Sequence, residues 1–86
     1  MTYYELKNRF YFEFVDSCGV LCATPVELYN AVNSIAAEKP DKEIDWLELK
    51  AHLAEAHIDH CMFDVISCLP TAAERREAER ILQQAQ

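Results

Sequence analysis

Four helix-start signatures constrain the fold of this chain more than any other feature of its sequence. In each, an oxygen-bearing side chain stands three residues before a glutamate: Thr2-x-x-Glu5, Thr24-Pro25-x-Glu27, Asp45-x-x-Glu48 and Thr71-x-x-Glu74. The first side chain accepts a hydrogen bond from an unpartnered N–H of the first helical turn, and the glutamate can reach back toward it. Pro25 is expected at the first helical position, where a missing N–H costs nothing. These signatures predict a helical protein.

The spacing of apolar residues predicts where each helix runs. Helices are expected over residues 3–18, 25–38, 46–57, 60–69 and 72–84, with Gly19 ending the first and Pro70 ending the fourth. The side chains expected to be buried are Tyr3, Leu6, Phe10, Phe14 and Val15, then Leu28, Ala31, Val32, Ile35 and Ala36, then Leu47, Leu49, Leu53 and Ala54, and finally Ala78, Ile81, Leu82 and Ala85. No flexible linker divides the chain, so we expect a single domain, 1–86, that is all-α: a compact bundle of four to five short helices.

One segment has a second interpretation. Phe10-Tyr11-Phe12-Glu13-Phe14-Val15 is rich in side chains that favour strands, and Asp16-Ser17-Cys18-Gly19 suits a turn. The alternative fold is therefore α+β, with an N-terminal β-hairpin at about residues 10–22.

The charge of the chain is strongly negative and uneven. Fifteen acidic residues against eight basic ones give a net charge of −7. The acidic residues concentrate in one stretch: Asp41, Glu43, Asp45, Glu48, Glu55, Asp59 and Asp64. A negative surface repels phosphate, so direct nucleic-acid binding is not expected. It attracts basic partners, which makes a protein with a basic surface the expected partner, whereas a solvated face that keeps the protein soluble is the alternative interpretation.

Two aromatic side chains are candidate anchors for such a partner. The first 14 residues contain six aromatic ones, more than one helix face can bury, and Phe12 is the first expected to stay exposed. Trp46 stands among acids at the start of a helix. The expected partner-binding residues are Asp41, Glu43, Asp45, Trp46, Glu48 and Phe12, with core packing as the alternative for the two aromatic residues. Reversal of Glu43, Asp45 and Glu48 to lysine is expected to abolish binding without unfolding the protein.

Cysteine and histidine residues allow a metal-binding alternative. Cys18-x-x-x-Cys22 and His57-x-x-x-Cys61 provide the ligand types that zinc prefers, and an i, i+4 spacing would put His57 and Cys61 on one helix face. Structural zinc sites usually hold closely spaced cysteine pairs, so buried reduced thiols are the favoured interpretation and no cofactor is expected.

The sequence contains no motif that predicts catalysis. It has no glycine-rich phosphate loop, nucleophile elbow or zinc-protease helix. The N-terminus does not resemble a secretory signal and no apolar run is long enough to span a membrane, so a cytoplasmic location is expected. In size, acidity and lack of a catalytic motif the chain is similar to small inhibitors of phages and mobile elements, including some anti-CRISPR proteins. This resemblance implies an inhibitor of a nucleic-acid-binding complex and carries over no functional residue. We therefore expect a non-enzymatic regulator or inhibitor of a basic partner; a homodimer and a small zinc-binding domain are the alternatives.

Overall fold

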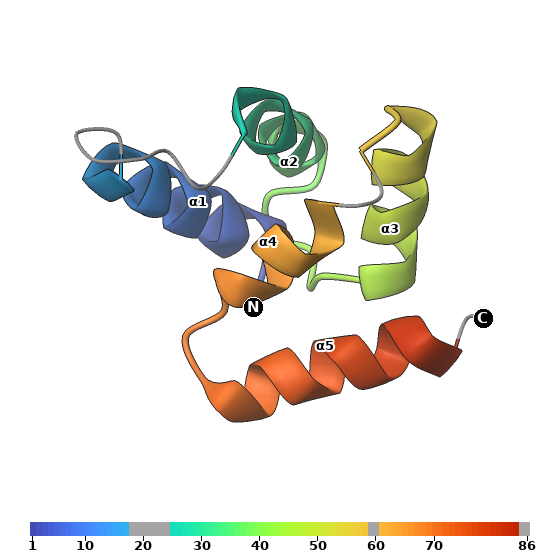
Figure 1. Cartoon of the computed structure of the whole chain (residues 1–86). Coiled ribbons are helices and arrows are strands. Elements are labelled where there is room, and N and C mark those ends of the chain that lie inside the picture. The colour runs from blue at the N-terminus through green and yellow to red at the C-terminus, as the bar shows by residue number, and fades with distance from the viewer. Residues whose placement is uncertain (18–24, 59–60, 85–86) are drawn as a thin grey trace. The chain divides into compact units, whose positions relative to one another are not determined.

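The regular structure of the chain is helical. The computed structural model describes residues 1–17, 25–58 and 61–84 (Figure 1). These residues form five helices, namely α1 (Tyr3–Ser17), α2 (Val26–Glu38), α3 (Trp46–Glu55), α4 (Met62–Ser67) and α5 (Ala72–Gln84). The all-α prediction, with four to five short helices, is confirmed. Of the helices in the described residues, none has the length and apolar character needed to cross a membrane.

The alternative of a β-hairpin is wrong where the structure describes it. Residues 10–17 belong to α1, whereas residues 18–22 and the expected helix stop at Gly19 lie outside the described residues. Tyr3, Leu6 and Phe10 are fully buried. Their i, i+3 and i+7 spacing places them on one side of a helix, and this burial outweighs the strand preference of the aromatic residues that follow.

The contacts of the chain group into two compact units, residues 1–44 and 45–86. In the first unit, α1 packs against α2. Besides Tyr3, Leu6 and Phe10 of α1, the described part of this unit's core contains Leu28, Val32, Ile35 and Ala36. The single domain 1–86 stays a prediction.

The start of α1 is held by the chain that follows α2. The backbone N–H of Tyr3 donates to the carbonyl oxygen of Lys42 at 3.1 Å, and that of Tyr4 donates to Pro40 at 3.1 Å. The N–H of Glu5 donates to Oγ1 of Thr2 at 3.2 Å, which confirms the predicted cap. The first three N–H groups of α1, which have no partner within the helix, are therefore all satisfied.

In the second unit, α3 and α4 each pack against α5. The buried side chains of this unit are Leu49, Leu53, Cys61, Met62, Val65, Ile66, Cys68, Leu69, Ala78 and Leu82. Two predicted caps are confirmed. Oδ1 of Asp45 accepts from the N–H groups of Leu47 at 3.0 Å and Glu48 at 3.2 Å, and Oγ1 of Thr71 accepts from the N–H of Glu74 at 3.1 Å.

Several details of the helices differ from the prediction. Pro25 precedes α2 in an extended conformation (φ −62°, ψ 145°) instead of forming its first turn, and the expected cap at Thr24 lies outside the described residues. Val15 and Leu47 are 46% and 43% exposed, although both were expected in the core. At about 100° per residue, Val15 is about 140° from Phe10 around α1, and Leu47 is about 160° from Leu49 around α3. Each therefore points away from the buried face.

The end of α3 is a Schellman motif. The N–H of His57 donates to the carbonyl of Ala54 at 3.0 Å, and that of Ile58 donates to Leu53 at 2.8 Å. His57 has φ 62°, the left-handed conformation that this motif requires. The helix that was expected to reach about His57 therefore ends at Glu55. The helix expected over residues 60–69 is also shorter, Met62–Ser67.

Candidate binding surfaces

Helix α1 has a second apolar face that its own fold leaves exposed. Tyr4 is 51% exposed, Tyr11 52%, Phe12 62% and Val15 46%. Tyr4, Tyr11 and Val15 follow each other at i, i+7 and i+11, which places them on one side of the helix, and Phe12 lies next to Tyr11. We call these four residues the α1 aromatic face. It lies on a different side of α1 from the buried residues Tyr3, Leu6 and Phe10.

The rings of Tyr11 and Tyr4 contact neighbouring side chains. The ring centroid of Tyr11 lies 6.1 Å from that of Phe12 with the ring planes 75° apart, an edge-to-face arrangement. It lies 6.4 Å from the ring of Tyr29, a half-buried residue of α2. Nζ of Lys7 lies 5.6 Å from the ring centroid of Tyr4, within range of a cation–π interaction. The ring of Tyr11 therefore contacts Phe12 on one side and Tyr29 on the other. Through the contact with Tyr29, the α1 aromatic face extends to α2.

The two aromatic candidates differ in exposure. Phe12 is exposed, as the helical wheel predicts, and lies in the α1 aromatic face. Trp46, the first residue of α3, is half-buried. Phe12 is therefore the more accessible of the two, while the partner-binding role of both stays a prediction.

The four acidic candidates differ in their interactions and in their exposure. Glu43 forms an ion pair with the N-terminal ammonium group at 2.8 Å, and Asp45 caps α3. Asp41 is exposed and Glu48 is half-buried. Lysine at position 45 could not accept from the N–H groups of the first turn of α3. The expected charge reversal that includes Asp45 would therefore destabilise the helix as well as change the charge.

The structure removes the geometric basis proposed for a zinc site. His57 is the left-handed residue after the end of α3 and Cys61 precedes α4, so the two residues do not share a helix face. Cys61 is buried with 6% exposure. Cys18 and Cys22 lie outside the described residues. In the described part of the chain, no three histidine, cysteine, aspartate or glutamate side chains are grouped as metal ligands.

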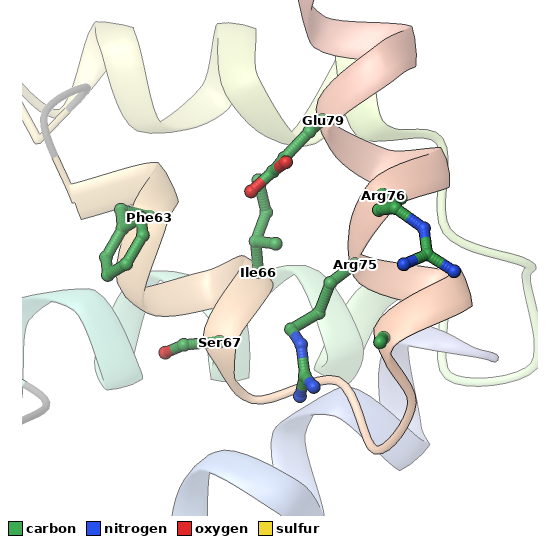
Figure 2. Close-up of a pocket in the computed structure, with 7 residues that line it drawn as sticks. Phe63, Ile66, Ser67, Arg75, Arg76 and Glu79 are labelled. Atoms are coloured by element: carbon green, nitrogen blue, oxygen red, sulfur yellow. The ribbon is translucent and has the colours of Figure 1, made fainter.

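A pocket lies between α4 and α5 in the second unit (Figure 2). Its volume is about 380 Å³, and its lining residues are Phe63, Ile66, Ser67, Ala72, Arg75, Arg76 and Glu79. Phe63 is 73% exposed. The pocket is therefore open, has an apolar wall and carries charged groups of both signs.

One arginine of this pocket has a fixed position. Nη1 of Arg75 donates to the carbonyl oxygen of Leu69 at 2.9 Å, across the turn between α4 and α5. In Figure 2 the guanidinium group of Arg75 points toward this turn, whereas the Glu79 side chain points toward the side of Ile66. The side chains of Arg75 and Glu79 thus point in different directions.

The sequence interpretation missed the pocket and most of the aromatic face. Tyr4, Tyr11 and Val15 follow a helical spacing, so a second apolar face of α1 could have been found from the sequence. Phe63 carries no such signal, because α4 has only six residues and is largely apolar. Arg75 depends on a contact with a residue six positions away, which helical periodicity does not predict.

Comparison with known proteins finds no family model that matches the chain, and no significantly similar curated protein or solved structure.

Proposed function

We propose that this protein is a non-enzymatic binding module that regulates or inhibits a basic protein partner, which docks on the α1 aromatic face. The observation that carries the proposal is the second apolar face of α1, formed by Tyr4, Tyr11, Phe12 and Val15. Soluble proteins rarely expose a large contiguous apolar patch unless it serves an interaction. Tyrosine is also among the residues most enriched where binding energy concentrates.

The side chains of this face suit protein recognition. Tyrosine and phenylalanine provide a large contact area with few rotatable bonds, so little conformational entropy is lost when they are covered. The contacts of Tyr11 with Phe12 and Tyr29 already restrict its ring. Burial of these rings by a partner would therefore gain apolar contact at a low ordering cost.

The charge of the protein supports a basic partner. The net charge is −7, and the exposed acids include Glu38 and Asp41 of the first unit. Opposite charge accelerates diffusional encounter, and the apolar face would then determine how long the complex lasts. Proteins that bind nucleic acids are one class with suitably basic surfaces. The proposal therefore includes an inhibitor of a nucleic-acid-binding complex.

A paired-variant capture experiment tests the proposal. The wild-type protein and a Tyr11→Ser/Phe12→Ser variant are used as bait in lysate of the native cell, and captured proteins are quantified by mass spectrometry. The control is Phe63→Ser, which removes an exposed phenylalanine from the second unit. We expect a basic partner whose recovery falls by about tenfold or more with the double variant, since loss of a hot spot costs about 2 kcal/mol or more.

The control and a second measurement make the outcome decisive. Phe63→Ser should retain the partner, and both variants should keep the helical circular dichroism spectrum of the wild type. Equal recovery with all three baits would contradict the proposal. Sedimentation of the wild type alone tests the homodimer alternative: a dimer that dissociates in the double variant would assign the aromatic face to a second copy of the chain.

A further inference from the structure

The charges of α5 are only partly neutralised. Arg80 is paired with Glu77, and a hydrogen bond from Arg80 holds the pKa of the Glu77 carboxyl below its usual value. Arg75 donates to a backbone carbonyl, and within the described residues neither Arg75 nor Arg76 has a carboxylate at ion-pair distance. Two guanidinium groups that have no acidic partner among the described residues thus line one pocket of a protein whose net charge is −7.

The position of these arginines is not one that stabilises a helix. Arg75 and Arg76 are the fourth and fifth residues of α5, near the positive end of the helix dipole, where acidic side chains are favoured. Glu79 lies four residues after Arg75, and ion pairs of this spacing are weaker when the base precedes the acid. An anion bound in the pocket would therefore supply a negative partner that the described residues do not provide.

Arg75 can bind such an anion without a large change in conformation. A guanidinium group has five N–H donors, and the Leu69 carbonyl occupies only one position on Nη1. The remaining donors suit the two oxygens of a carboxylate, which arginine binds in a bidentate manner. Ser67 is not available as a donor, because its hydroxyl donates to the carbonyl of Asp64 at 2.8 Å.

The remainder of the pocket is apolar at one side and acidic at another. Phe63, Ile66 and Ala72 contribute apolar surface, and Phe63 has 73% of its area exposed to water. In Figure 2 the carboxylate side chain of Glu79 points toward the side of Ile66, and the Arg75 guanidinium group points toward the turn between α4 and α5. A ligand that extends from Arg75 along Ile66 would meet this carboxylate and must be uncharged there.

We propose that the pocket between α4 and α5 binds a small monocarboxylate with an apolar tail. The carboxylate pairs with Arg75, with Arg76 adding positive potential, and the tail covers Phe63 and Ile66. A volume of about 380 Å³ is within the range of small-molecule sites. This inference concerns the second unit and does not depend on the proposed partner of the α1 aromatic face.

Octanoate and its dicarboxylate counterpart, suberate, test the proposal directly. Each is titrated into the protein at low salt and followed by amide chemical shifts. We expect octanoate to shift the resonances of α4 and of the first turns of α5 in a saturable manner. Suberate should bind at least about tenfold more weakly than octanoate, because its second carboxylate approaches Glu79 in an apolar setting.

Three variants assign the roles of the residues. Phe63→Ala removes an exposed side chain and should weaken octanoate binding by about tenfold through lost apolar contact. Arg75→Gln should weaken it similarly, with thermal melting as the check that the fold is retained. Glu79→Gln should improve suberate binding selectively, an effect that a purely structural change would not produce. Arg80→Gln is the matched control, since it removes one arginine charge from α5 outside the pocket.

The results that would overturn the proposal are specific. Absence of saturable shifts with octanoate would exclude the site. Equal weakening by Arg80→Gln and Arg75→Gln would show that net charge alone governs binding. Suberate binding equal to that of octanoate in the wild type would contradict the role of Glu79. If no partner of the α1 aromatic face were found, these measurements on the pocket would still stand.

Discussion

His57 occupies a backbone position that suits glycine better than histidine. It is the one non-glycine residue with positive φ in the described part of the chain, at 62°. A residue with a Cβ atom pays a steric cost in this conformation, but the two hydrogen bonds of the Schellman motif depend on it. The side chain of His57 is exposed, so it gains no stabilisation from burial that would offset this steric cost.

Replacement of His57 should therefore change stability in opposite directions. We expect His57→Gly to raise the free energy of unfolding by up to about 1 kcal/mol, and His57→Val to lower it, because β-branched residues are poorly tolerated at positive φ. Urea denaturation measures both. His52→Gly is the matched control: it makes the same substitution inside α3 and should lower stability by about 1 kcal/mol. A destabilising effect of His57→Gly would contradict this account of the α3 end.

At the scale of the element, α1 combines two apolar faces with different roles. One contains Tyr3, Leu6 and Phe10, each with no exposed area, and packs in the first unit. The other is the α1 aromatic face, in which Phe12 is 62% exposed. The Thr2 cap and the carbonyls of Pro40 and Lys42 fix where the helix starts, and the spacing of about 100° per residue decides which residues share a face.

Two phenylalanines only two positions apart should therefore behave differently. Phe10→Ala removes a fully buried ring and should lower the free energy of unfolding by about 3–5 kcal/mol. Phe12→Ala removes an exposed ring and should change it by no more than about 0.5 kcal/mol. Chemical denaturation of the two variants checks this contrast. A large loss of stability in Phe12→Ala would show that Phe12 belongs to the core and would remove it from the proposed docking face.

At the scale of the whole molecule, the acidic charge should act on association rather than on stability. The variant Glu38→Gln/Asp41→Asn/Asp45→Asn removes three negative charges, and asparagine at position 45 can still cap α3. Once a basic partner is available, we expect this variant to associate more slowly than the wild type at low salt. The difference should shrink as salt screens charges beyond about 10 Å at 0.1 M.

Stopped-flow association across a salt series measures this effect, and thermal melting of the free protein is the control. The melting temperature should change little, since the asparagine that replaces Asp45 keeps the cap and the other two side chains are exposed. Association rates that match those of the wild type at low salt would show that the acidic surface only keeps the protein soluble. The aromatic face would then be tested separately by its own variants.

The helix starts were predictable because their interactions are local. Thr2, Asp45 and Thr71 each accept a hydrogen bond from an N–H two or three residues later, so the pattern in the sequence and the contact in the structure coincide. The same locality explains the correct helical interpretation of residues 10–17. Residue spacing also predicted that Leu6, Phe10, Leu49 and Leu53 would be buried.

The candidate site was less predictable, because it depends on which faces the fold covers. Val15 and Leu47 are as apolar as the core residues, but packing in three dimensions leaves both exposed. Periodicity identifies the faces of a helix and does not say which one meets a neighbour. Similarly, the sequence around Asp45 indicates both an acidic stretch and a cap, and only its hydrogen bonds show that it serves as a cap.

By itself, the sequence determined the helical class, most helix boundaries and the negative charge, since these follow from composition and from interactions within one helical turn. Only the tertiary structure decided that α1 has an uncovered aromatic face, that His57 ends α3, and that Arg75 is held against the Leu69 carbonyl beside an open pocket. These features arise where one element meets another. Contacts of that kind depend on the path of the whole chain within each unit, which no local pattern of residues specifies.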